Sequence, residues 1–133
     1  MKAAVATAFD RPPTTAVASL MTRRPVSVPA GAPFASVAAV LSRNGISAVP
    51  VVDRDGVLLG VVSQTDLIGG RDGAGLTARE LMTAPAHTVA ADATVSTATR
   101  LLAKAGVRRL FVTEGGRLAG VLSRRDLLRS YFR

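Results

Sequence analysis

A serine followed three residues later by an aspartate occurs twice in this sequence, each time in the same local setting. Residues 60–66 read Gly-Val-Val-Ser-Gln-Thr-Asp, and residues 120–126 read Gly-Val-Leu-Ser-Arg-Arg-Asp. The aliphatic pair indicates a buried strand, and the serine that follows is a preferred N-cap of a helix. An aspartate in the first helical turn adds a favourable interaction with the helix dipole. Each pair is therefore predicted to open a helix and to stabilise it by about 1 kcal/mol.

The same geometry suits a phosphorylated sugar. A helix N-terminus gathers unpaired N–H groups and a partial positive charge, which attract phosphate. A carboxylate at that point can accept hydrogen bonds from both vicinal hydroxyls of a ribose. The second copy also carries Arg124 and Arg125 where the first has Gln64 and Thr65. Arginine forms strong charge-assisted bonds to phosphate, so the second copy favours an anionic ligand.

Catalytic constellations are missing from the sequence. The only histidine, His87, has no second histidine with which to share a metal, and there is no cysteine. The nine acidic residues are scattered, without the spacing of metal ligands. No nucleophile is accompanied by a base and an orienting group. We expect no enzyme, no catalytic residue and no metal site.

Each serine–aspartate pair ends a run predicted as strand, helix, strand, strand, helix. In the first run, an apolar face at helical spacing follows Pro33 and stops at Gly45; it comprises Phe34, Val37, Ala38 and Leu41. The second run has a weaker face of Val95, Ala98, Thr99 and Leu102, with Asp92 as predicted N-cap and Gly106 as the stop. Two hairpins follow these helices, with strands at 48–52 and 57–62 and at 109–113 and 117–122.

The two runs are copies of one sequence unit. Leu20-Met21-Thr22 recurs as Leu81-Met82-Thr83, and the Gly-to-Asp segments recur at an offset of 60. The predicted organisation is a loose N-terminal arm (1–14), repeat 1 (15–69), a Gly-rich linker (70–76) and repeat 2 (77–133). Thr77 and Glu80 have the spacing of a capping box that opens the second repeat.

These repeats resemble the cystathionine-β-synthase (CBS) domain. The likeness rests on residues 46–53 (Ile-Ser-Ala-Val-Pro-Val-Val-Asp) and 60–67 in repeat 1, and on 107–112 and 120–127 in repeat 2. Repeat 2 departs from the family pattern at Phe111 and Thr113, where a proline and an aliphatic residue are usual. The resemblance implies a mixed α+β fold of two β-α-β-β-α repeats packed about a pseudo-twofold axis.

The resemblance also implies two clefts that mix residues of both repeats. One would combine Ser47 and Ala48 with Val121, Ser123, Arg124, Arg125 and Asp126. The other would combine Arg108 and Arg109 with Val61, Ser63, Thr65 and Asp66. In each cleft the aspartate would hold the ribose. Because the first combination has small residues beside the base and two arginines near the phosphate, we hypothesise that it binds the ligand more tightly.

The implied function is regulatory. The module would bind an adenosine compound such as AMP, ADP or ATP between its repeats and transmit occupancy to a partner or within a homodimer, with no cofactor required and with a fused or separate effector domain. Two other functions stay open, namely a structural dimerisation module without ligand and a basic nucleic-acid-binding protein. The arginine pairs lack interleaved aromatic residues and match no nucleic-acid reader motif.

Composition limits the partners and the compartment. The formal net charge is +8, from 17 basic and nine acidic residues, which favours anionic partners. No apolar run reaches the length of a membrane span, and the N-terminal stretch is not a signal peptide. We therefore expect a soluble cytoplasmic protein.

Overall fold

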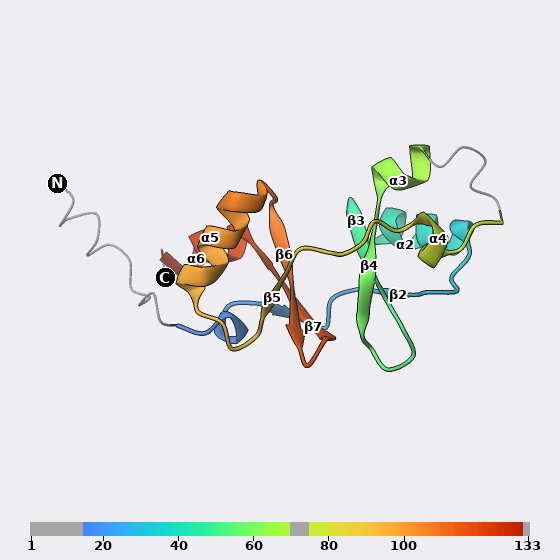
Figure 1. The fold of residues 1–133 in the computed structure, drawn as a ribbon. Coiled ribbons are helices and arrows are strands. Elements are labelled where there is room, and N and C mark those ends of the chain that lie inside the picture. The colour runs from blue at the N-terminus through green and yellow to red at the C-terminus, as the bar shows by residue number, and fades with distance from the viewer. Residues whose placement is uncertain (1–14, 70–74, 132–133) are drawn as a thin grey trace. The chain divides into compact units, whose positions relative to one another are not determined.

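The computed structural model describes residues 15–69 and 75–131. These residues fall into two compact units, each with its own sheet, helices and core (Figure 1). The described part of unit 1 comprises residues 15–25, 87–115 and 119–131, and that of unit 2 comprises residues 26–69, 75–86 and 116–118. The predicted arm and most of the predicted linker lie outside the described residues.

Unit 2 is built on a three-stranded sheet in the order β2-β3-β4. Strand β2 runs parallel to β3, and β3 forms an antiparallel hairpin with β4 in which Ala48 faces Ser63. The elements of this unit are β2 (Val28–Pro29), α2 (Phe34–Asn44), β3 (Ala48–Val52), β4 (Leu58–Ser63), α3 (Gln64–Gly69) and α4 (Ala78–Leu81).

Unit 1 repeats this plan on a four-stranded sheet in the order β1-β7-β6-β5. Strand β5 runs parallel to β6, and β1 runs antiparallel to β7. Helices α5 and α6 both contribute buried side chains to the core of this unit. The elements are η1 (Val17–Ser19), β1 (Thr22–Arg23), β5 (Thr88–Ala90), α5 (Val95–Ala105), β6 (Arg109–Glu114), β7 (Arg117–Ser123) and α6 (Arg124–Tyr131).

The predicted order of strand, helix, strand, strand, helix is confirmed in both units. Helix α2 starts after Pro33 and ends at Gly45, whose φ of 59° is the left-handed conformation that glycine adopts without strain. Helix α5 ends in the same way at Gly106, with φ 67°. The capping box between Thr77 and Glu80 is also present, with the Thr77 N–H donating to Glu80 Oε1 at 2.9 Å.

One local prediction is wrong. The N-cap of α5 is Thr94, whose hydroxyl accepts from the Thr97 N–H at 3.1 Å, whereas Asp92 lies exposed in the preceding turn. Thr94 has the extended backbone that an N-cap requires, and the helix begins at the residue after it. His87 lies just before strand β5, where its carbonyl accepts from the Phe111 N–H.

Each unit has a separate aliphatic core between its sheet and its helices. In unit 1, α5 contributes the buried side chains of Val95, Ala98 and Leu102, which pack with Leu110 and Leu122 of the sheet. In unit 2, Val37 and Leu41 of α2 pack with Val49, Val51 and Val62. Aliphatic residues on one face of each helix thus fix that helix against its sheet.

Each Leu-Met-Thr segment pairs with a strand of the other sequence repeat. Thr22 pairs with Val121 of β7 in unit 1, and Thr83 pairs with Val61 of β4 in unit 2. A glycine in each of those strands allows the close approach. A Cβ on Gly60 would lie 2.7 Å from both Met82 Sδ and the Thr83 carbonyl oxygen, and one on Gly120 would meet Met21 and Thr22 at the same distances.

Candidate functional site

In unit 2 the end of β4 and the start of α3 form the Asp66 cluster, which we define as Ser63, Asp66 and Thr83. The Ser63 N–H donates to Asp66 Oδ2 at 2.8 Å, and the Ser63 hydroxyl donates to the same oxygen at 3.0 Å. In return the Asp66 N–H donates to Ser63 Oγ at 3.1 Å. The predicted N-cap pair is therefore confirmed, and the carboxylate is fixed by its own chain.

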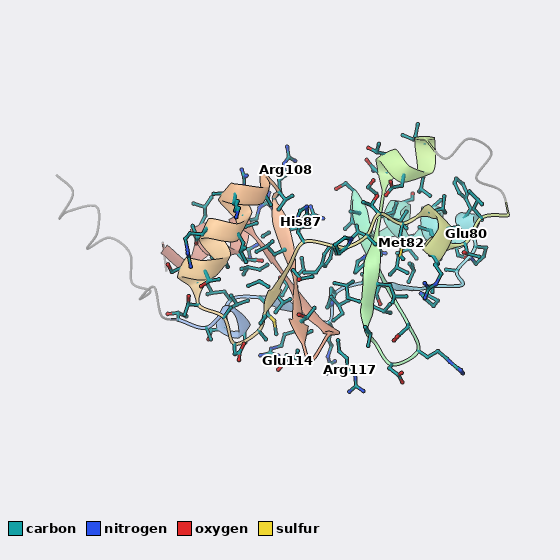
Figure 2. The ribbon with its side chains drawn as sticks, in the orientation of Figure 1. Glu80, Met82, His87, Arg108, Glu114 and Arg117 are labelled. Atoms are coloured by element: carbon teal, nitrogen blue, oxygen red, sulfur yellow. The ribbon has the colours of Figure 1, made fainter. Side chains whose placement is uncertain are left out.

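A third residue reaches this carboxylate from a distant part of the sequence. The Thr83 hydroxyl donates to Asp66 Oδ1 at 3.2 Å across 17 residues of chain. Thr83 is held there because it exchanges both backbone hydrogen bonds with Val61, at 2.8 and 3.0 Å. The neighbouring Met82 packs against β4 at Gly60 (Figure 2).

The start of β3 lies next to the Asp66 cluster. The Ser47 carbonyl accepts from the Gln64 N–H at 2.9 Å, and Ala48 is paired with Ser63 in the hairpin. The side chain of Ser47 is exposed and Ala48 is half-buried. Thr65, on the first turn of α3, is exposed. Unit 2 thus brings all its predicted site residues to one end of its sheet: Ser47, Ala48, Val61, Ser63, Thr65 and Asp66.

In unit 1 the end of β7 and the start of α6 form the Asp126 cluster, defined as Ser123, Arg124, Arg125 and Asp126. The Ser123 N–H donates to Asp126 Oδ2 at 2.9 Å, and the Asp126 N–H donates to Ser123 Oγ at 3.1 Å. Within the described residues, the proton of the Ser123 hydroxyl has no acceptor. The capping is therefore the same as in unit 2, but one hydroxyl donor stays available.

The Asp126 carboxylate is well buried, with its side chain 10% exposed. Arg129, itself 71% exposed, approaches Asp126 Oδ1 at 3.7 Å. An ion pair of that length with so exposed an arginine holds the carboxylate weakly. Among the described residues, Asp126 Oδ1 therefore has this long ion pair and no hydrogen bond.

The Asp126 cluster contains two arginines, and a third arginine, Arg108, lies next to it. Arg124 and Arg125 are the first two residues of α6, and both are exposed. Arg108 precedes β6, and its carbonyl accepts from the Arg124 N–H at 3.0 Å (Figure 2). Unit 1 thus brings its predicted site residues to one end of its sheet: Arg108, Arg109, Val121, Ser123, Arg124, Arg125 and Asp126.

Charge is divided unequally between the units. The described residues of unit 2 carry four arginines and four carboxylates, and so have no net charge. Those of unit 1 carry three carboxylates and nine basic residues, namely Arg23, Arg24, Arg100, Lys104, Arg108, Arg109, Arg124, Arg125 and Arg129. The electrostatic attraction for an anion is therefore concentrated on unit 1.

Thr83 was not among the site residues predicted from the sequence. The sequence does contain a pattern that points to Thr83, because a Leu-Met-Thr segment occurs before each serine–aspartate motif. The spacing along the chain gives no indication that the second threonine reaches Asp66, which precedes it. The predicted combinations across the two repeats, such as Ser47 with Asp126, join residues of different units and stay predictions.

Comparisons with known proteins agree with the two repeats. The family model described as "CBS domain" matches residues 17–72 and 78–133. Protein MK0525 of Methanopyrus kandleri is 30% identical over 98 residues, which are 69% of this chain and 50% of that protein. Inosine-5'-monophosphate dehydrogenase of Mycobacterium tuberculosis is 33% identical over 98 residues, which are 73% of this chain but 18% of the enzyme. The chain thus spans half or less of these curated relatives.

Solved structures with the same fold cover the chain more completely. CBSX2 of Arabidopsis thaliana, described as a CBS-pair protein, has a TM-score of 0.78 at 27% identity, over 87% of this chain and 93% of its own. A second CBSX2 structure, described as a complex with AMP, matches equally well. The CBS domain of a membrane protein from Sphaerobacter thermophilus has a TM-score of 0.78 at 25% identity, over 96% of this chain and 93% of its own.

Proposed function

This chain belongs to the CBS domain family as a tandem pair, and from this premise we propose that it binds an adenosine nucleotide through the Asp126 cluster as a regulatory module. The single observation that carries the proposal is the Asp126 carboxylate, whose Oδ1 accepts no hydrogen bond within the described residues, beside Arg124 and Arg125 at the start of α6. Asp126 accepts from the ribose hydroxyls, and the arginines bind phosphate.

Charge supports the assignment to unit 1. The nine basic and three acidic residues in the described part of unit 1 attract an anion, whereas the described residues of unit 2, which carry no net charge, offer no such attraction. Arginine beside a helix start adds charge-assisted hydrogen bonds to the N–H groups already there. The CBSX2 relative that is described as an AMP complex supports an adenosine ligand. The combination of the Asp126 cluster with Ser47 and Ala48, which the family resemblance implies, stays part of this proposal.

We propose a regulatory role because the residues of the proposed site are arranged to bind a ligand at a helix start. Ser123 and Asp126 cap helix α6 through two hydrogen bonds to each other. A bound nucleotide then acts by favouring one conformation or assembly over another. We propose that it does so within a homodimer or on an effector domain.

Exposed aliphatic side chains support the homodimer. Ile68 of α3 is 83% exposed, and Leu128 at the equivalent position of α6 is 57% exposed. Large aliphatic side chains so placed in both repeats are suited to an apolar contact with a second copy.

Calorimetric titration with AMP and with ATP tests the proposed ligand. An Asp126→Ala change is expected to weaken binding about 10- to 100-fold, because hydrogen bonds to a charged group contribute about 1.5–3 kcal/mol. Asp66→Ala is the matched control in the other repeat and is expected to change affinity much less. Equal losses in the two variants would contradict the assignment to Asp126.

Thermal unfolding separates this function from its alternatives. A nucleotide at a hundred times its dissociation constant raises the free energy of unfolding by about 2.7 kcal/mol. A protein that is stabilised by none of AMP, ADP and ATP would be a structural module. One that instead binds RNA or DNA with an affinity falling steeply with salt would be a nucleic-acid-binding protein.

A further inference from the structure

The two aspartates of the repeated motif differ in how many hydrogen bonds they already accept. An ionised carboxylate offers about four acceptor positions on its two oxygens. Asp66 accepts from the Ser63 N–H, from the Ser63 hydroxyl and from the Thr83 hydroxyl. Counted over the residues that the structure describes, one acceptor position of Asp66 is left, whereas the two vicinal hydroxyls of a ribose need two.

Asp126 accepts far less from its own chain. Within the described part of the chain, its carboxylate accepts one hydrogen bond, from the Ser123 N–H, and Arg129 adds a longer ion pair at 3.7 Å. Thr22, which corresponds to Thr83, is paired with Val121 of β7, but its hydroxyl makes no side-chain hydrogen bond within the described residues. Asp126 therefore retains the acceptor positions that a vicinal diol requires.

The position of Thr83 is fixed by the fold. Both of its backbone hydrogen bonds go to Val61, and Gly60 allows its chain to lie against β4. The hydroxyl thus lies within 3.2 Å of Asp66 Oδ1 without any change in the sheet. A ribose that reaches Asp66 must displace this hydroxyl, because the Oδ2 atom already accepts two bonds from Ser63.

We infer that Thr83 is a specificity-determining residue that closes the Asp66 cluster to the nucleotide, so that each chain binds one ligand, at Asp126. This inference rests on the proposed function, since it decides which of two similar clusters the ligand occupies. The hydroxyl of Thr83 takes the place of one ribose hydroxyl at Asp66, whereas among the described residues no hydroxyl donates to Asp126.

The stoichiometry of AMP and ATP binding to the full chain tests the inference. Wild-type protein is expected to bind one nucleotide per chain. Thr83→Val removes the hydroxyl while keeping a β-branched side chain for the pairing with Val61, and it is expected to add a second, weaker binding event. That event is weaker because Gln64 and Thr65 stand where the Asp126 cluster has arginines.

Two matched variants control for side effects of the substitution. Thr83→Ser keeps the hydroxyl and is expected to keep the stoichiometry at one. Thr22→Val makes the same change in the other repeat and is also expected to leave one ligand per chain. A further Asp66→Ala change in the Thr83→Val background should remove the second event, which ties that event to the Asp66 carboxylate.

The outcomes separate this inference from the proposed function. Two ligands per wild-type chain, or one ligand in a folded Thr83→Val variant, would overturn the role of Thr83 and leave nucleotide binding intact. An absence of binding in both wild-type and Thr83→Val protein would overturn the two together. Circular dichroism of each variant confirms that it is folded, and Thr83→Ser distinguishes loss of the hydroxyl from general damage at this position.

Discussion

Replacement of Gly120 by alanine tests the close packing that places the Leu-Met-Thr segment on strand β7. A Cβ at this position would lie 2.7 Å from Met21 Sδ and 2.7 Å from the Thr22 carbonyl oxygen. The methionine side chain is flexible and can move. The carbonyl belongs to backbone that pairs with β7, so the segment from Met21 to Arg23 has to shift outward.

The expected loss of stability follows from two opposing terms. Overpacking of this kind costs about 1–3 kcal/mol. Alanine also restricts the unfolded chain, which offsets about 0.4–1 kcal/mol. The net loss is about 1–2 kcal/mol, which corresponds to a fall in Tm of roughly 3–8 °C for a chain of this size.

Urea unfolding followed by circular dichroism, at one fixed protein concentration, measures this loss. Gly31→Ala is the matched control, because nothing lies within 4 Å of a Cβ at that glycine and its φ is not positive. That variant is expected to be as stable as wild type or slightly more stable. Gly60→Ala, the equivalent change in unit 2, is expected to lose as much as Gly120→Ala, since Met82 and Thr83 lie at the same distances.

A Gly120→Ala protein that stays within about 0.5 kcal/mol of wild type, the usual range for surface substitutions, would refute the packing argument. The same conclusion would follow if the Gly31→Ala control lost as much stability as Gly120→Ala. In either case Gly60 and Gly120 would not be needed for the close approach of the Leu-Met-Thr segments.

The remaining predictions concern a helix cap and the assembly. In urea unfolding, Thr94→Ala is expected to lower the free energy of unfolding by about 1 kcal/mol, because it removes the N-cap of α5. Asp92→Ala is expected to change this free energy little. A larger loss in Asp92→Ala than in Thr94→Ala would show that Asp92 is the N-cap. Wild-type protein is expected to sediment as a dimer and the Ile68→Lys/Leu128→Lys variant as a monomer, with Val26→Lys, also exposed, as control. A wild-type monomer would contradict the proposed homodimer.

The features that depend on neighbouring residues could be predicted from the amino-acid sequence. Helix faces, the left-handed glycines 45 and 106, the Thr77–Glu80 capping box and both serine–aspartate caps are local, because the groups involved lie within about one turn of each other. Because the sequence unit is repeated, most of these local patterns occur twice and support each other. Even here the cap of α5 was misplaced by two residues, since aspartate and threonine are both favourable caps and only the backbone angles distinguish them.

The number of acceptor positions that each motif offers to a ligand depends instead on contacts between distant segments of the folded chain. Each Leu-Met-Thr segment packs against a strand of the other sequence repeat, and Gly60 and Gly120 in those strands allow the close approach. Through it Thr83 reaches Asp66 across 17 residues, whereas within the described residues the Thr22 hydroxyl makes no hydrogen bond to Asp126. The two motifs have the same spacing of serine and aspartate, so their difference arises from contacts between distant segments, which depend on chain path and side-chain packing rather than on local periodicity.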